Sequence, residues 1–476
     1  MSDQFISTGG GNTTRGSAFT YKNLAINFAV ISLLFCVNKL GALGNLLSMF
    51  ILALVAMQST SGALKALSML GLIIMGNPYI VEKSMVMTYF RFPLVILAGG
   101  RILFDLFTKR PEVMRLSFLN GLLLFGAVCV FIAPINGYFT SIAVLKASLF
   151  TYGVYCILAG TMVNRNGFSD LTLWFLALVA FISIATYFTI PLGLSHVFRG
   201  KIVSFGTGGL SGVTSHQQVL GSFASISAIL CFSLGTFSRL PHRWMYNCLF
   251  LSFLPILWMT KSRTAVGTLL LAIIFVLAVA PFVVRGQKAM FKRFKPAKWI
   301  AAGTGLIIVG FFADFASGGN INEKMMGFVF KRGMGSHYTV TSEEITSSRM
   351  GLIEVSWDAF LNHPMTGINF GTSTDPRFAY TATILSAPTE KGFLPTAILE
   401  ETGIIGTAFF LLFLLLFFYR LYCDENIIGI AVMAGFLFQN LGEMMFFSLG
   451  GAGLFCWSII GAGVAIGYRH QTMRRP

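Results

Sequence analysis

Long apolar stretches recur along this 476-residue chain, separated by short polar connections. Backbone groups in hydrocarbon must bond to one another, so an apolar stretch of about 17 to 25 residues predicts a helix that crosses a bilayer. The first four stretches are short or charged, so the count lies between twelve and the fourteen found here. The predicted helices are 22–37, 40–57, 63–76, 90–107, 115–133, 138–160, 171–192, 216–236, 244–259, 264–284, 298–315, 394–419, 427–443 and 446–467.

Two polar segments interrupt this pattern, a Gly-rich one at 193–215 and a much longer one that begins at 317. We therefore expect an all-α, polytopic membrane protein with one large loop. Its predicted parts are a disordered cytoplasmic tail (1–21), transmembrane helices 1–11 (22–316), a periplasmic loop with short amphipathic helices (317–392), transmembrane helices 12–14 (393–468) and a cytoplasmic tail (469–476).

The composition supports a membrane protein, and it affects how the net positive charge is interpreted. Hydrophobic residues make up 55% of the chain and charged residues 11%, against about 25% charged in soluble domains. The formal net charge of +16 could suggest nucleic acid. However, the basic residues lie in short loops between apolar stretches, where they set orientation and contact anionic lipid. We expect no nucleic-acid partner.

The basic loops also predict an orientation, because Lys and Arg accumulate on the cytoplasmic side. The strongest signal is the loop between the tenth and eleventh predicted helices. Counting helices from this loop places the other strongly basic loops inside as well, and it places 317–392 and 193–215 outside. The anchoring basic residues are Arg285, Lys288, Lys292, Arg293, Lys295 and Lys298.

Within the long loop, residues 347–361 predict a short amphipathic helix with Trp357 among its apolar residues. Pro364 predicts its end, because the residue before a proline is displaced from helical geometry.

Four short motifs follow one another in this region: 348–357 (SRMGLIEVSW), 362–371 (NHPMTGINFG), 390–393 (EKGF) and 399–406 (LEETGIIG). With them the chain resembles the bacterial O-antigen ligase and Wzy polymerase superfamily. That superfamily has an Arg shortly before a Trp, an "HP, then G-x-x-x-G" turn and an "E-x-G-I-I-G" helix entry. The resemblance covers 261–406 and implies a GT-C-like membrane glycosyltransferase.

The resemblance further implies transfer of an oligosaccharide from undecaprenyl pyrophosphate at the periplasmic face of a bacterial inner membrane. Donor and acceptor would both be lipid-linked, no metal or other cofactor would be needed, and a chain-length regulator would be a possible partner. The sequence has no nucleotide-binding loop and no D-x-D pair in an outer loop, which suits a donor that is already activated.

Two arginines are the predicted ligands of the pyrophosphate. Arg263 begins a helix at its predicted outer end and resembles the superfamily's "S-R" arginine, while Arg349 matches the Arg before the Trp. A guanidinium is planar and permanently charged, and it binds phosphate oxygens in pairs. The ordinary alternatives are a lipid-facing Arg at 263 and an ion pair of Arg349 with a loop carboxylate.

The general base is less clear. O-antigen ligases carry a His before the "E-x-G-I-I-G" helix, but that position falls at or near Gly392 here, and 389–392 contain no His. This absence favours a polymerase-type member. Glu390 is then the predicted base, with an ion pair to Lys391 or Arg377 as the ordinary alternative.

Other residues are candidates for substrate contact. Glu400 and Glu401 are not among these candidates. We expect them to lie at a helix N-terminus, where the positive end of the helix dipole stabilises carboxylates. The further substrate-binding candidates are Lys391, Arg199, Lys201, His363, Trp357, Arg377 and Glu443.

The predicted function is therefore a polysaccharide polymerase of the Wzy type. Two alternatives stay open: a ligase of the same superfamily, which differs in its acceptor, and a polysaccharide or lipid transporter. Transporters commonly contain paired inverted repeats, which we do not find in the sequence.

Overall fold

The fold is given by a computed structural model. It describes residues 21–136, 139–163, 168–195, 197–198, 201–202, 209–238, 242–284, 342–372 and 391–472. For residues 168–169, 342–350 and 468–472 and for the two strands, only the backbone is described.

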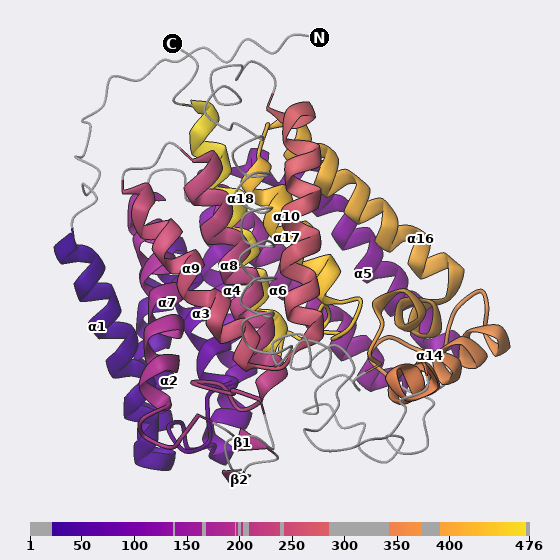
Figure 1. The fold of residues 1–476 in the computed structure, drawn as a ribbon. Coiled ribbons are helices and arrows are strands. Elements are labelled where there is room, and N and C mark those ends of the chain that lie inside the picture. The colour runs from indigo at the N-terminus through magenta and orange to yellow at the C-terminus, as the bar shows by residue number, and fades with distance from the viewer. Residues whose placement is uncertain are drawn as a thin grey trace.

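The described chain is almost entirely helical (Figure 1). A two-stranded antiparallel hairpin, β1 (Val197–Phe198) and β2 (Lys201–Ile202), is the sheet within these residues. Two short 3-10 helices, η1 (Asn38–Leu40) and η2 (Pro111–Arg115), occupy helix connections. The α-helices are α1 (Tyr21–Val37), α2 (Gly41–Gln58), α3 (Thr60–Ile74), α4 (Met85–Lys109), α5 (Ser117–Asn136), α6 (Thr140–Val163), α7 (Phe168–Thr189), α8 (Gln217–Phe237), α9 (Arg243–Met259), α10 (Arg263–Val283), α14 (Ser342–Asn362), α16 (Leu394–Cys423), α17 (Ile427–Gln439) and α18 (Ala452–Thr472).

The predicted all-helical membrane protein is confirmed. Within the described residues, seven helical stretches are long and apolar enough to cross a membrane, and the chain is therefore a multi-pass membrane protein. Every predicted stretch coincides with a helix except 298–315, which lies outside the described residues. How many helices cross stays a prediction.

Successive helices run in opposite directions, so their ends collect on two sides of the bundle (Figure 1). We call the side that carries residues 363–372 the turn side. The end of α5 lies there, because Asn136 bonds to Thr366. The start of α16 and the end of α17 also lie there, since the Leu394 N–H donates to the Asn440 carbonyl.

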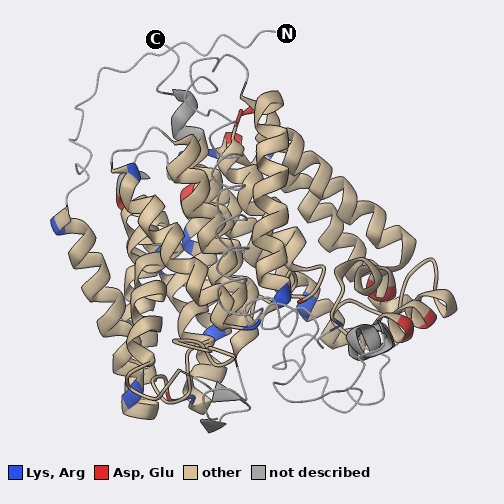
Figure 2. Ribbon diagram, viewed as in Figure 1, with Lys and Arg blue, Asp and Glu red and all other residues tan. Residues whose placement is uncertain are grey.

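Charged residues are sparse along the bundle and lie mostly near helix ends (Figure 2). The opposite side carries a set of basic residues at the helix ends and connections of α4, α5, α9 and α16. The residues of this set are Lys109, Arg110, Arg115, Arg243 and Arg420. The counting along the sequence also puts these residues on one side, but the turn side carries basic residues at helix ends too, among them Lys39, Lys83, Lys261 and Arg263, so the orientation stays a prediction.

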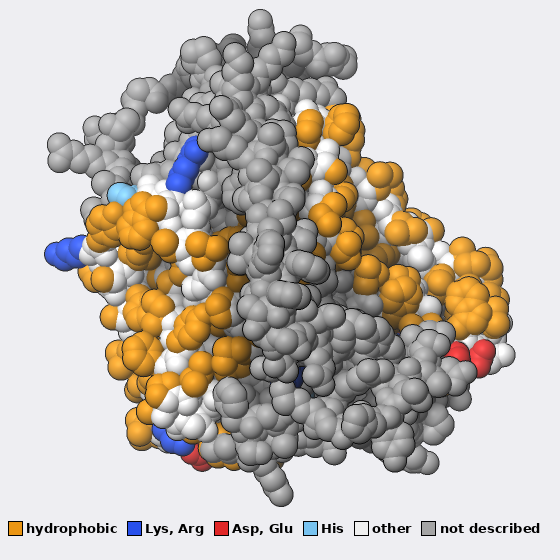
Figure 3. All heavy atoms as spheres, in the orientation of Figure 1, with side chains coloured by type: hydrophobic (Ala, Val, Ile, Leu, Met, Phe, Trp, Pro, Cys, Tyr) orange, Lys and Arg blue, Asp and Glu red, His pale blue; other side chains and the backbone are white. Residues whose placement is uncertain are grey.

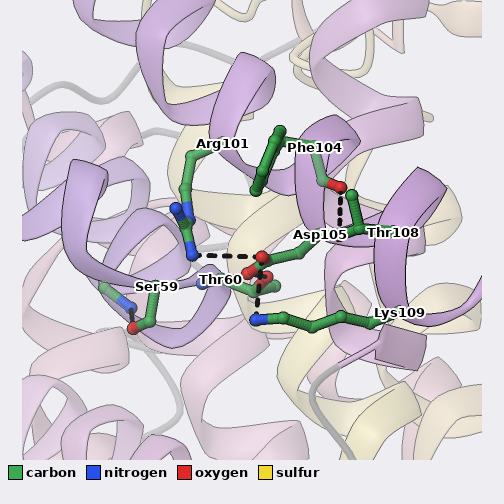
Figure 4. A network of polar contacts seen from close by, with 8 residues as sticks. Ser59, Thr60, Arg101, Phe104, Asp105, Thr108 and Lys109 are labelled. Carbon is green, nitrogen blue, oxygen red and sulfur yellow. Dashed lines mark hydrogen bonds and ion pairs between the residues drawn. The ribbon is translucent and has the colours of Figure 1, made fainter.

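Two charges inside the predicted fourth helix, Arg101 and Asp105, belong to an ionic cluster on that opposite side (Figure 4). The Asp105 carboxylate is buried and accepts from the backbone N–H and the hydroxyl of Thr60, the first residue of α3, at 3.3 and 2.7 Å. Arg101 and Lys109 pair with the other oxygen of Asp105 at 3.0 and 2.9 Å. Asp105 therefore ties α4 to the start of α3 with its charge compensated.

Two predicted helix boundaries near the C-terminus are wrong. The stretch predicted at 427–443 ends at Gln439, and the one predicted at 446–467 begins at Ala452. The Asn440 side chain explains the difference, since its oxygen accepts from the N–H groups of Met445 and Phe446 at 2.7 and 2.8 Å. A carboxamide that bonds to nearby backbone stabilises a turn in place of a helix.

The outward faces of the helices are apolar. Figure 3 shows hydrophobic side chains covering most of the described surface in view. Such a surface suits acyl chains as its solvent.

Candidate functional site

The turn of residues 363–372 packs against a break in α16 on the turn side. Gly403 interrupts α16 with φ 60° and ψ −166°, a conformation that is essentially restricted to glycine. The first segment of α16 therefore ends at about Thr402, and the second begins at Ile404. A helix break leaves backbone N–H and C=O groups without helical partners.

Backbone groups of the turn satisfy these broken ends. The Ile404 and Ile405 N–H groups donate to the Pro364 and Met365 carbonyls at 2.9 and 3.2 Å. In the other direction, the Ile368 N–H donates to the Glu400 carbonyl at 2.7 Å, and the Asn369 N–H donates to the Glu401 carbonyl at 3.2 Å. The "HP, then G" motif and the "E-x-G-I-I-G" motif are thus two halves of one backbone contact.

Glycine is required on both sides of this contact. A Cβ at Gly403 would lie 2.4 Å from the Met365 carbonyl carbon, and one at Gly367 would lie 2.5 Å from that of Glu401. Gly367 also has a positive φ of 66°. The two backbones can approach this closely only without side chains at these positions.

The turn is also anchored to α5 and to the core. The Thr366 hydroxyl donates to Asn136 at 2.7 Å, and the Asn369 amide donates to the Ala133 carbonyl at 3.3 Å. Phe370 is buried among aromatic rings and packs edge-on against Phe447 with a centroid distance of 5.0 Å. The turn is therefore held by three separate elements.

A buried ionic cluster lies beside the break. Lys391 Nζ is 3.1 Å from a carboxylate oxygen of Glu400 and 3.1 Å from one of Glu401, and all three side chains are at most 3% exposed. The distances are those of ion pairs. The expectation that Glu400 and Glu401 occupy a helix N-terminus is wrong, because α16 begins at Leu394 and breaks just after them.

The peptide groups of Gly371 connect this cluster to α6. The Gly371 N–H donates to Glu401 Oε2 at 2.8 Å, and Lys146 Nζ donates to the Gly371 carbonyl at 2.8 Å. Sequence reasoning did not single out Lys146. Its signal was available, since a lysine inside an apolar stretch is rare and marks a cavity or a charged partner.

A second polar group joins α8 to the connection after α17. Glu443 is buried and accepts from the Gln218 amide at 2.8 Å, while the Gln439 amide donates to the Ser222 hydroxyl at 2.8 Å. Arg263 is the first residue of α10, which packs against both α8 and α17. Ser262 caps that helix by accepting from the Ala265 N–H. The predicted helix-end position of Arg263 is therefore confirmed.

The other predicted site residues are placed only in part. Trp357 and His363 are exposed at the end of α14, and Arg349 lies in α14 with only its backbone described. Lys201 lies in β2, likewise as backbone only. Arg199, Arg377 and Glu390 lie outside the described residues.

Glu390 nevertheless directly precedes the buried Lys391 in the chain. In the part of the chain that the structure describes, no group of three or more His, Cys, Asp or Glu side chains is arranged to hold a metal ion.

A scan of the chain against protein-family models finds no match. A search among curated proteins also finds no match.

Proposed function

We propose that this protein is a polysaccharide polymerase that transfers an oligosaccharide from undecaprenyl pyrophosphate onto a lipid-linked acceptor. The observation that carries the proposal is the contact between the turn of 363–372 and the break in α16. It joins two motifs on which the resemblance to the O-antigen ligase and polymerase superfamily rests, and it gives both a common physical role.

In the proposed reaction, an acceptor hydroxyl oxygen attacks the anomeric carbon of the donor sugar. The bond from that carbon to the pyrophosphate oxygen breaks, and undecaprenyl pyrophosphate leaves with the bonding electron pair. The hydroxyl proton passes to the base, for which Glu390 is the candidate. A single displacement of this kind inverts the anomeric carbon.

Arg263 and Arg349 would stabilise the charge that develops on the departing pyrophosphate. Charge stabilisation of this kind needs a fixed donor, and the capped start of α10 gives Arg263 such a position. Lys391 is engaged with Glu400 and Glu401, so we propose that it positions the neighbouring Glu390.

We further propose that the turn side faces the periplasm of a bacterial inner membrane. The helix-by-helix counting from the basic loop at 285–298 supports this orientation, because it assigns the opposite side, with Lys109, Arg115 and Arg420, to the cytoplasm. A cysteine at the exposed Asn362 should react with an impermeant thiol reagent in intact spheroplasts, and one at the exposed Glu112 should react only after the membrane is opened. The reverse pattern would invert the orientation.

Substitutions at the proposed catalytic residues test the activity. Arg263→Lys keeps the charge but loses the paired guanidinium donors, so turnover should fall by roughly 10-fold to 1000-fold while membrane expression stays normal. Glu390→Gln should remove the rise of rate with pH that a working base produces. Both variants should be assayed with lipid-linked repeat units in proteoliposomes.

An exposed basic residue provides a control, and Arg115→Gln on the opposite side should leave turnover unchanged. Wild-type turnover in Arg263→Lys would remove its proposed role. An unchanged pH profile in Glu390→Gln would place the base elsewhere.

The break in α16 is the observation that favours a transporter as the second candidate. Transporters often bind substrates at interrupted helices whose broken ends face the site. In α16, however, the backbone N–H and C=O groups at the break are already bonded to the turn. Transport would appear as movement of intact donor across the bilayer without any new linkage.

A further inference from the structure

One flank of α14 exposes large apolar side chains. Trp357 and Leu361 lie one helical turn apart, so they share a face, and they are 44% and 57% exposed. Met365 in the following turn is 55% exposed. The inward face of α14 carries the buried residues Ala359 and Phe360, and α14 packs against α16.

The next flank of the same helix is acidic. Glu354 and Asp358 are both exposed and are also one turn apart. Around the helix axis, the buried face is therefore followed by an exposed apolar flank and then by an exposed acidic flank. A helix that lies in a membrane interface has this arrangement, because one side meets acyl chains and the next meets water.

The depth of α14 follows from its connection to α16. The segment of α16 beyond the break, 404–423, has about 20 residues and a length of about 30 Å, which matches the hydrocarbon thickness of a bilayer. The Pro364 and Met365 carbonyls accept from the first two N–H groups of that segment. The C-terminal end of α14 is thereby fixed at the level where the hydrocarbon begins.

The apolar flank continues the lipid-facing surface of α16. Ile404, Leu411 and Leu415 are 49%, 57% and 66% exposed along the second segment of that helix. Figure 3 shows hydrophobic side chains running along this part of the molecule to the outer end of the arm that carries α14, with acidic side chains at its lower edge.

We propose that α14 lies in the boundary between headgroups and acyl chains on the turn side, with Trp357, Leu361 and Met365 in contact with lipid and Glu354 and Asp358 facing water. Tryptophan suits this depth, since its ring is apolar and its N–H can reach polar headgroups. The helix would hold the start of the 363–372 turn at the level of lipid phosphates. This inference rests on the membrane-crossing of α16 and is independent of the proposed activity.

Fluorescence quenching by brominated lipids tests the position of Trp357. Wild-type protein and Trp357→Phe are reconstituted in phosphatidylcholine vesicles brominated either near the headgroup end or near the tail end of the acyl chains. The difference between the two proteins isolates Trp357. Its emission should be quenched, and more strongly by the shallow bromines. A difference signal that neither brominated lipid quenches would overturn the proposal.

A pair of cysteine substitutions on α14 shows whether lipid, water or protein covers the apolar flank. In opened membranes, Asp358→Cys should react readily with an impermeant maleimide, and Leu361→Cys should react at least about tenfold more slowly because its thiol is shielded from water. Wild-type protein gives the background from its own cysteines. Similar rates at both positions would place the flank in water. Protection of Leu361→Cys without bromine quenching of Trp357 would mean that protein covers the flank, which also contradicts the proposal.

Discussion

Replacing Gly403 by alanine is expected to destabilise the protein by about 4 kcal/mol, the sum of a backbone conformation restricted to glycine and a steric overlap. The new Cβ would lie 2.4 Å from the Met365 carbonyl carbon, so the turn would have to move away. Movement of the turn would leave the N–H groups of Ile404 and Ile405 without their acceptors. Thermal unfolding of the purified protein in detergent measures the effect.

Gly351→Ala is the matched control for this substitution. Gly351 lies in the middle of α14, and a Cβ there would meet no atom within 4 Å. Alanine is favoured over glycine in a helix by about 0.5 to 1 kcal/mol, so the unfolding midpoint should stay the same or rise. An unchanged midpoint in Gly403→Ala would show that the break does not need glycine.

Replacing Lys391 by methionine is expected to cost about 3 to 5 kcal/mol, because two carboxylates would stay buried without their cation. Both carboxylates are at most 1% exposed, so water cannot take the place of the ammonium without rearrangement. The loss should appear as a lower unfolding midpoint and as less folded protein after extraction. The turn should also loosen, since Glu401 binds both Lys391 and the Gly371 N–H.

Arg420→Met is the control on the same helix. Arg420 pairs with Asp424 at 2.7 Å, but the two side chains are 38% and 11% exposed, so water can solvate the carboxylate in place of Arg420 and the loss should be smaller, about 1 kcal/mol. Adding Glu400→Gln and Glu401→Gln to Lys391→Met removes the stranded charges, so the triple variant should be more stable than the single one. A triple variant less stable than Lys391→Met would contradict the role given to the charges.

The apolar pattern was enough to predict most of the helices, because a chain in hydrocarbon must form its backbone hydrogen bonds internally and a helix does so. It could not reveal the break in α16, because glycine is frequent in membrane helices and a positive φ leaves no mark in hydropathy. The ends of α17 and α18 were missed for a similar reason. One buried asparagine, Asn440, decides where the chain turns.

The candidate site was predictable as motifs but not as a cluster. Both halves of the turn contact were singled out from the sequence, whereas their mutual bonding required the structure. An ion pair of Glu390 with Lys391 was the ordinary alternative from the sequence, whereas the described partners of Lys391 are Glu400 and Glu401. Lys146 was overlooked because it stands alone in an apolar stretch, and its partner Gly371 is distant in sequence.

The most direct test of the proposed polymerase combines product length with the released lipid. Purified protein in proteoliposomes would receive lipid-linked repeat units as donor and acceptor, with EDTA present and no nucleotide. The proposal predicts a ladder of lengthening products and one molecule of undecaprenyl pyrophosphate released for each new linkage. Intact donor that crosses the bilayer without lengthening, or linkages formed without release of lipid pyrophosphate, would contradict it.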